Sequence, residues 1–275
     1  MPEVLLYALI VGVFVGSAAG YLGSIMISKH MALVGDALSH VALPGLALGI
    51  LFNFNPFIGA FTLLAISVVL TWYLQKSTRL SIEAIIGVIF VLALAIGILI
   101  TPEVDLLEAL FGDISKVTFT DAVVTAVVSV FVILVTRSIY DKLALSMISK
   151  ELAVSNRIKV EQVNLIYLLL VAMIVAVGIK EVGTLLVGAV VIVPAAAARN
   201  VSSSLYRYSL FSAAFGVVSA LSGVLLSGYV GLPAGPLVVI VGAVIFAVGL
   251  VASYLYSRQQ RKFQTMKEET WAIRS

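Results

Sequence analysis

The sequence contains no cysteine and only two histidines in its 275 residues. The lack of cysteine excludes disulfides, thiolate metal ligands and thiol nucleophiles, so any metal ion must be bound by nitrogen and oxygen atoms. Charged residues are also scarce, at 11% of the chain, whereas 61% is hydrophobic and the mean hydropathy is +1.16. Because so few polar side chains cannot coat a soluble globule, the composition predicts an integral membrane protein.

Long apolar blocks make up most of the chain. A membrane-spanning helix needs roughly 20 apolar residues, so a chain of this length has room for roughly eight to ten spans. The blocks lie near residues 4–27, 36–52, 56–75, 83–100, 119–137, 163–179, 183–198, 208–229 and 234–257. They predict an all-α, polytopic membrane protein with nine transmembrane helices in a single domain, residues 1–275. Because the 36–52 block is short, an eight-span alternative with a re-entrant second segment stays open.

Lysine and arginine are distributed unevenly between the predicted loops. With the N-terminus outside, fifteen of the seventeen fall on the cytoplasmic side, and only Lys116 and Lys180 fall outside. Membrane proteins retain basic residues on the cytoplasmic side. The distribution therefore predicts an external N-terminus and a cytoplasmic tail over residues 258–275. It also accounts for the net charge of +3 without a nucleic-acid partner.

An acid and a histidine lie one helical turn apart in the segment GDALSHVALPG, residues 35–45. The i, i+4 spacing of Asp36 and His40 places both side chains on one helical face, where an oxygen and a nitrogen can converge on one point. In a structural interpretation, the carboxylate orients and neutralises a buried histidine. In a functional one, the pair marks a site, because an ionisable group in a membrane costs about 3 kcal/mol or more.

We favour the functional interpretation of this pair. Oxygen and imidazole ligands suit zinc or manganese rather than copper(I), which prefers sulfur. Two ligands are too few for a closed tetrahedral site, so other residues or a second subunit must contribute, or binding is weak. The other histidine, His30, falls in a predicted cytoplasmic turn, where we expect it to be solvated.

A polar segment, SMISKELAVSNRIKVEQ, occupies residues 146–162 between two predicted spans. It is long enough for a short helix, with Ser149 as the N-cap. The first turn of this helix would contain Lys150, Glu151, Leu152 and Ala153. Such a helix could dock into a cytosolic partner, or the segment could be a solvated connection. The residues alone leave both interpretations open.

The segment MALVGDALSHVALPGLALG resembles the signature of the zinc and manganese permeases of ATP-binding-cassette importers. Further similarity to this family follows the same order and spacing along nearly the whole chain. The similar segments are NPF at 55–57, LFGDISKVT at 110–118, LSMISKELAVSNRIKV at 145–160, VGTLLVGAVVIVPAAAARN at 182–200 and LPAGPLVVIVGA at 232–243. Together these segments make a specific match, whereas none of them would do so alone.

The resemblance implies a homodimeric, multi-pass permease in the inner membrane of a prokaryotic cell. It would receive zinc or manganese, with ferrous iron also compatible, from an extracytoplasmic metal-binding protein. Two cytosolic ATPase subunits would drive it. The implied fold is similar to that of the vitamin B12 and siderophore importers, with the pathway at the dimer interface. No permanently bound cofactor is expected.

The resemblance also implies roles for particular residues. Asp36 and His40 match the family's acid and histidine, which contact the ion in transit, and residues 149–160 match the coupling helix that meets the ATPase. The chain has no GxxxxGK[ST] phosphate loop, so ATP hydrolysis is expected on a separate subunit and the permease is not itself an enzyme. We expect the binding protein to dock on the external surface formed by Glu103, Asp105, Glu108, Lys116 and Lys180.

Three alternatives make different demands on the sequence. A chelate importer for siderophore or cobalamin would need a wide cavity without ion ligands in its wall, and the acid–imidazole pair argues against it. A secondary carrier could use Asp36 for proton coupling and would need no ATPase. An intramembrane hydrolase would need an activated nucleophile or a metal triad, and two histidines without cysteine offer no such constellation.

Overall fold

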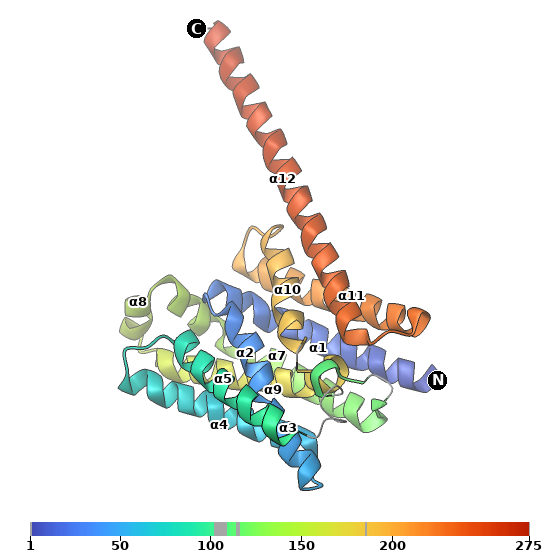
Figure 1. The fold of residues 1–275 in the computed structure, drawn as a ribbon. Coiled ribbons are helices and arrows are strands. Elements are labelled where there is room, and N and C mark those ends of the chain that lie inside the picture. The colour runs from blue at the N-terminus through green and yellow to red at the C-terminus, as the bar shows by residue number, and fades with distance from the viewer. Residues whose placement is uncertain (1, 102–108, 114–115, 185, 275) are drawn as a thin grey trace.

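The structure, a computed structural model, describes the backbone of residues 2–101, 109–113, 116–184 and 186–274, and their side chains except those of residue 2, residues 180–181 and residues 255–274. The described chain is built from helices without any strand, so the predicted all-α class is confirmed (Figure 1). In chain order the helices are α1 (Pro2–Ser28), α2 (Ala32–Val41), α3 (Leu43–Leu51), α4 (Pro56–Ser77), α5 (Ile82–Ile100), α7 (Phe119–Ile148), α8 (Lys150–Ser155), α9 (Val160–Val182), α10 (Val187–Arg199), α11 (Leu205–Val230) and α12 (Ala234–Arg274).

Several helices begin at a residue whose side chain caps the first turn. In each case the side-chain oxygen accepts a hydrogen bond from a backbone N–H that has no partner within the helix. These residues are Asn55 before α4, Ser81 before α5, Thr118 before α7, Ser149 before α8 and Ser204 before α11. The short polar loops therefore fix where the apolar helices start.

Eight helical segments within the described residues are long and apolar enough to cross a membrane. The predicted block near residues 36–52 starts earlier in the structure, and α2 and α3 together cover 20 residues, Ala32–Leu51. The short segment is instead α10, whose 13 residues extend roughly 20 Å, less than the about 30 Å of a hydrocarbon core. By length the described residues thus contain eight spans, the alternative to the predicted nine, but the short segment is α10 and not the 36–52 block.

A proline interrupts the second span directly after the predicted site. Pro44 has no backbone N–H, so the carbonyl of His40, four residues earlier, lacks its normal helical donor. The carbonyl of His40 instead accepts from the N–H of Ala42, the residue between α2 and α3. The span therefore consists of two helices with a break at Ala42, two residues after His40.

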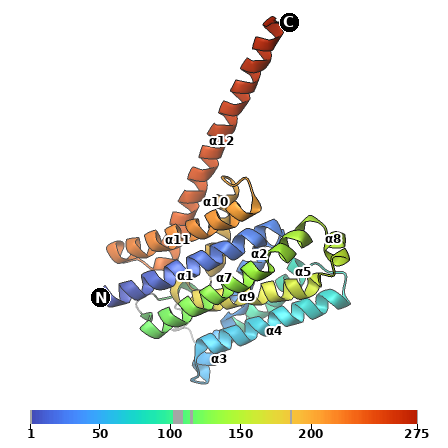
Figure 2. The same ribbon diagram turned by 180° about the vertical axis from the view of Figure 1, so that it is seen from behind.

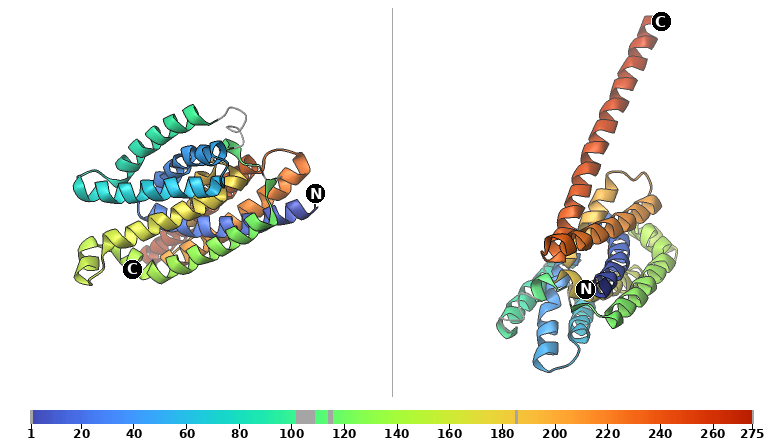
Figure 3. Two further views of the ribbon diagram at one scale, coloured as in Figure 1. Left: turned by 90° about the horizontal axis from the view of Figure 1, so that it is seen from below. Right: turned by 90° about the vertical axis from the view of Figure 1, so that its right-hand side faces the viewer.

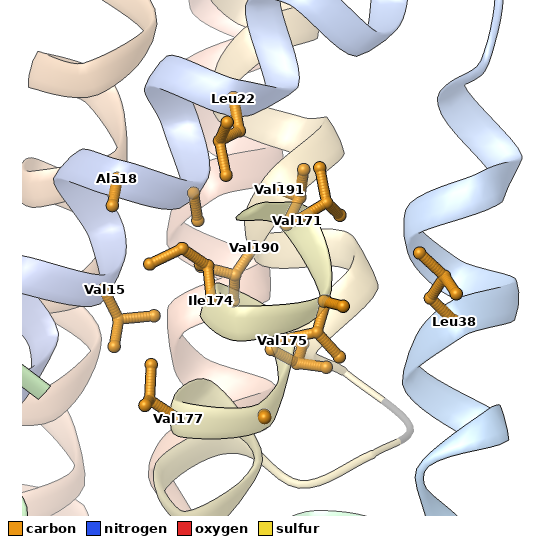
Figure 4. Packing of buried hydrophobic residues seen from close by; sticks show 14 of the residues in the cluster. Val15, Ala18, Leu22, Leu38, Val171, Ile174, Val175, Val177, Val190 and Val191 are labelled. Atoms are coloured by element: carbon orange, nitrogen blue, oxygen red, sulfur yellow. The ribbon is translucent and has the colours of Figure 1, made fainter. Parts of the chain in front are cut away.

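The buried core lies where α1, α9 and α10 meet, with α2 to one side. Figure 4 shows Val15 and Leu22 of α1 facing Ile174 of α9 and Val190 of α10, and all four are buried. Tyr167 of α9 reaches into the same core, where its hydroxyl donates to the carbonyl of Leu22 over 2.8 Å. A hydroxyl paired with a carbonyl stabilises helix contacts where no water is available.

Glycines allow α1 to approach α11 closely. A Cβ on Gly16 would lie 2.6 Å from the carbonyl oxygen of Gly216, and the hydroxyl of Ser212 donates to the carbonyl of Gly20. Because lipid gives no hydrophobic drive for helix association, close backbone contact of this kind holds transmembrane helices together. The view from behind shows α1 and α11 running side by side (Figure 2).

Most long helices run along one common direction, which gives the bundle two ends. The α8 end contains α8, the turn between α1 and α2 and the turn between α4 and α5, as Figures 1 and 3 show. The N-terminus and the turn between α3 and α4 lie at the opposite end. Helix α12 departs from this common direction and continues beyond the bundle, where it includes residues 258–274 of the predicted tail.

Candidate metal site and docking surfaces

His40 is a buried imidazole without a hydrogen-bond partner on one nitrogen. Only 8% of the residue is exposed, and its ring lies 5.2 Å, centre to centre, from the ring of Phe90 on α5. Its Nδ1 atom is buried and has no partner among the described residues. A buried polar atom normally has a partner, so an unpaired imidazole nitrogen suits a position where a ligand binds transiently.

Asp36 lies against the first turn of α10. A Cβ added to Gly188 would be 2.5 Å from the Cα of Asp36 and 2.8 Å from its Oδ1. Only a glycine permits this approach between α2 and α10. The Asp36 carboxylate therefore lies beside the first turn of α10.

Ser39, which lies between the two residues in the sequence, points its hydroxyl elsewhere. Its Oγ donates to the backbone carbonyl of Asp36 over 2.6 Å, and the residue is fully buried. Such back-bonding to a carbonyl in the preceding turn is typical of serine inside helices. The polar pair on the α2 face therefore consists of Asp36 and His40 alone.

One chain supplies few ligands. The described residues contain no group of three or more histidine, cysteine, aspartate or glutamate side chains that could hold a metal ion. Among these residue types, Asp36 and His40 therefore have no third described partner that would complete a metal site in one chain. The role of the pair as metal ligands stays a prediction, as does the contribution of ligands from a second subunit.

The predicted capped helix in the polar segment forms as α8. Ser149 caps it, with its Oγ accepting from the N–H of Leu152 over 3.2 Å. Lys150 and Glu151 are exposed, as is Leu152 at 51%. Ala153, in contrast, is fully buried against the bundle. Ala153 therefore anchors α8, and the outward surface of the helix comes from its neighbours.

The predicted external docking residues are only partly described. Glu103, Asp105 and Glu108 lie outside the described residues. Lys116 is exposed and lines the same cavity as Ile179 near the end of α9, the helix that contains Lys180. The structure thus brings Lys116 close to the end of α9 that carries Lys180. His30 is exposed in the turn after α1, as expected.

Two neighbours of the site were not found by sequence reasoning. Gly188 lies in one of the segments that resemble the family, but nothing in its spacing connects it with Asp36. Phe90 is one apolar residue among many in α5. Both contacts join segments far apart in the sequence, so only the packing of α2 against α5 and α10 reveals them.

Asp36 and the unpaired imidazole of His40 lie on a broken apolar span within a bundle of long apolar helices. This combination is that of a polytopic membrane transport protein. The chain belongs to the ABC 3 transport family, whose model matches residues 1–253.

Curated relatives are similar over most of their length. The "High-affinity zinc uptake system membrane protein ZnuB" of Haemophilus influenzae is 31% identical, over 91% of this chain and 98% of the relative. The "Manganese transport system membrane protein MntC" of Halalkalibacterium halodurans is 32% identical, over 90% of this chain and 86% of the relative.

Solved structures show the same architecture. The structure of "PsaBC from Streptococcus pneumoniae in complex with Fab" matches with a TM-score of 0.79 and 28% identity, over 88% of this chain and 89% of that chain. A putative metal-chelate type ABC transporter in an inward-facing conformation matches with a TM-score of 0.70 at 19% identity. This second likeness concerns the fold alone.

Proposed function

We propose that this protein is the membrane permease subunit of an ATP-binding-cassette importer that moves a divalent transition metal ion, zinc or manganese, into the cytoplasm. The observation that carries the proposal is the pair on α2, an acid one turn before a buried imidazole whose Nδ1 has no partner among the described residues. Relatives that are similar over nine-tenths of this chain are named for zinc or manganese transport, which supports the same cargo here.

The pair supports transient rather than tight binding of the ion. In a homodimer with the pathway at its interface, Asp36 and His40 from two copies would offer up to four oxygen and nitrogen ligands, enough for a tetrahedral shell. A site in a pathway must bind well enough to admit the ion and weakly enough to release it. A metal-bound imidazole must be unprotonated, so acidification opposes binding.

The helix breaks around the pair fit the same role. The α2–α3 break leaves the carbonyl of His40 without its normal helical donor, and α10 begins beside Asp36. Interrupted helices place partial charges of backbone groups next to ions in many transporters. Here the two breaks lie next to the two proposed ligands, which supports an ion step at this level of the bundle.

The remaining parts of the chain take the roles of a coupled importer. The exposed surface of α8 meets a separate ATPase subunit on the cytoplasmic side, where the C-terminus also lies. The opposite end receives the ion from an extracytoplasmic binding protein, with Glu103, Asp105, Glu108, Lys116 and Lys180 as the docking residues. The similarity to the PsaBC complex and the unequal distribution of basic residues support this arrangement.

Uptake of radiolabelled zinc and manganese into cells tests the proposal. The cells would express the chain with its ATPase and binding protein. Asp36→Asn preserves the shape of the side chain, so it should retain the fold and still reduce uptake by at least about tenfold, as should His40→Ala. Expression and dimer formation are measured in parallel.

The chain offers matched controls for both variants. His30→Asn changes the other histidine, and asparagine tolerates its positive φ of 58°. Asp141→Asn changes an exposed acid on α7. Both controls should transport normally. Wild-type uptake in Asp36→Asn and His40→Ala would make the pair structural, and uptake that persists without the ATPase would favour a proton-coupled carrier.

A further inference from the structure

A lysine-rich pocket lies at the α8 end of the bundle, away from the Asp36–His40 pair. Its volume is about 270 Å³, and residues from the α1–α2 turn and from α4, α7, α8 and α9 line it. The polar residues that matter here are Lys29, Lys76, Ser146, Lys150, Glu161 and Asn164. The metal-import proposal gives this pocket no role.

Lys29 brings an uncompensated positive charge into the pocket. Its Nζ donates to the amide oxygen of Asn164 over 2.8 Å and to the hydroxyl of Ser146 over 3.4 Å. Both partners are neutral, and no described carboxylate lies within 4.0 Å of its ammonium group. Burial lowers the pKa of Lys29 to about 8. An ammonium group without a counter-ion is stabilised when an anion enters beside it.

The other charges of the pocket leave it positive. Lys76 forms an ion pair of 3.5 Å with Glu161, and its Nζ also lies 3.9 Å from the centre of the Trp72 ring. Lys150 is exposed at the start of α8. Three lysines and one glutamate therefore line the pocket, which gives a net charge of +2.

The pocket lies at the ends of membrane-spanning helices. Lys29 directly follows α1, Lys76 is in the last turn of α4, and Glu161 is in the first turn of α9. Tryptophan and lysine near helix ends are typical of the interface, where lipid headgroups lie. The phosphates of anionic lipids are at the same depth and attract clustered lysines.

We propose that this pocket binds a phosphate group, presented by the headgroup of an anionic lipid or by a free phosphate compound. Lysine ammonium groups make short, charge-assisted hydrogen bonds to phosphate oxygens. Because the pocket joins the start of α8 to α1, α4 and α9, a bound phosphate would hold α8 in place. This consequence for coupling rests on the proposed function, whereas the binding itself does not.

Fluorescence titration of the purified full chain tests the proposal. A Trp271→Phe background leaves Trp72, beside Lys76, as the only tryptophan. The probes are dioctanoyl phosphatidylglycerol, dioctanoyl phosphatidylcholine and inorganic phosphate, at constant ionic strength. We expect saturable binding of phosphatidylglycerol and weaker binding of phosphatidylcholine. Saturation by inorganic phosphate as well would show that a free phosphate is sufficient.

Charge-removing variants locate the binding. Lys29→Gln and Lys76→Gln should each raise the dissociation constant by about tenfold, the typical effect of one hydrogen bond to a charged group. Lys142→Gln, an exposed lysine of α7 that does not line the pocket, should have no effect. If Lys29→Gln does not fold, Lys150→Gln takes its place, because Lys150 is exposed.

Two results would overturn the proposal: no saturable response to any of the probes, or equal dissociation constants in the pocket variants and in Lys142→Gln. Neither experiment includes a metal ion or an ATPase. A failure here therefore leaves the metal-import proposal intact, and a failure of the uptake experiment leaves this one intact.

Discussion

At the scale of single residues, the position of Asp36 depends on a glycine, Gly188, which has no side chain. The first turn of α10 touches Asp36 where Gly188 has only hydrogen. The Asp36 carboxylate lies beside the N-terminus of α10 because the backbones of α2 and α10 approach each other closely. Any residue other than glycine at position 188 would prevent this approach. Gly188 is thus a positioning residue for the proposed metal ligand.

Gly188→Ala should disturb the site without removing a ligand. The new Cβ would lie 2.5 Å from a backbone atom of Asp36, so α2 and α10 must separate, at about 1–3 kcal/mol of overpacking. We expect a lower melting temperature and a loss of radiometal uptake. Gly87→Ala on α5 is the matched control, since nothing lies within 4 Å of its Cβ position. Equal uptake in both variants would remove the positioning role.

Lys29 makes stability depend on pH. Burial lowers its pKa to about 8 from the ordinary 10.5, so between these values the unfolded chain binds more protons than the folded one. Stability therefore rises with pH across that window. In phosphate-free buffer, the melting temperature of wild type minus that of Lys29→Met should increase between pH 8 and pH 10. Lys142→Met should show no such change relative to wild type. Parallel profiles for wild type and Lys29→Met would contradict the lowered pKa of Lys29.

At the scale of helices, α8 has one side that faces the bundle and one that faces out. Ala153 is fully buried, whereas Leu152 and Val154 are 51% and 58% exposed. The two sides separate anchoring of the helix from contact with a partner. Substitutions at neighbouring positions of the same short helix should therefore have different effects.

Leu152→Asp should uncouple ATP hydrolysis from metal uptake without destabilising the permease, because it removes an apolar contact from an exposed surface. Ala153→Arg should also lower the melting temperature, since an unpaired charge would replace a buried methyl group. The measurements are the melting temperature of the purified chain, and metal uptake and metal-stimulated ATPase activity with the assembled transporter. Normal uptake in both variants would refute the coupling role of α8.

The sequence predicted the helices better than their interruptions. Apolar length was enough to predict the all-α class. Ser149 and the residues after it indicated a short capped helix at the position of α8, although the residues alone left a solvated connection open. The break after His40 follows from Pro44, which is visible in the sequence, but the late start of α10 does not. That start depends on Gly183, whose φ of +79° ends α9, and on hydrogen bonds of Thr184 to the carbonyl of Ala109, which is distant in the sequence.

The same limit applies to the candidate site. The spacing of Asp36 and His40 predicted a pair on one helical face, because both residues belong to one helix. The environment of the pair, with Phe90 from α5 and Gly188 from α10, depends on packing between helices. The pocket around Lys29 was missed for the same reason, since its charges come from five separate parts of the chain.

At the scale of the whole molecule, the short helix α10 decides how many times the chain crosses the membrane. Helix α9 starts at the α8 end and runs to the opposite end, where Thr184 contacts Ala109. Helix α11 starts near the α8 end again, because Ser209 in its second turn pairs with Ser24 near the end of α1 over 2.8 Å. Residues 183–204 must therefore lead from one end to the other, although only 13 of them form a helix.

Cysteine labelling tests this path, and the lack of native cysteine gives it no background. With nine crossings and an external N-terminus, Thr78→Cys and Ser203→Cys lie inside, and Leu232→Cys, 53% exposed in the native residue, lies outside. An impermeant maleimide on intact cells should label only Leu232→Cys, and permeabilised cells should label all three. Labelling of Ser203→Cys from outside would mean that α10 does not cross. Labelling of Thr78→Cys from outside would reverse the orientation and place α8 on the wrong side for an ATPase.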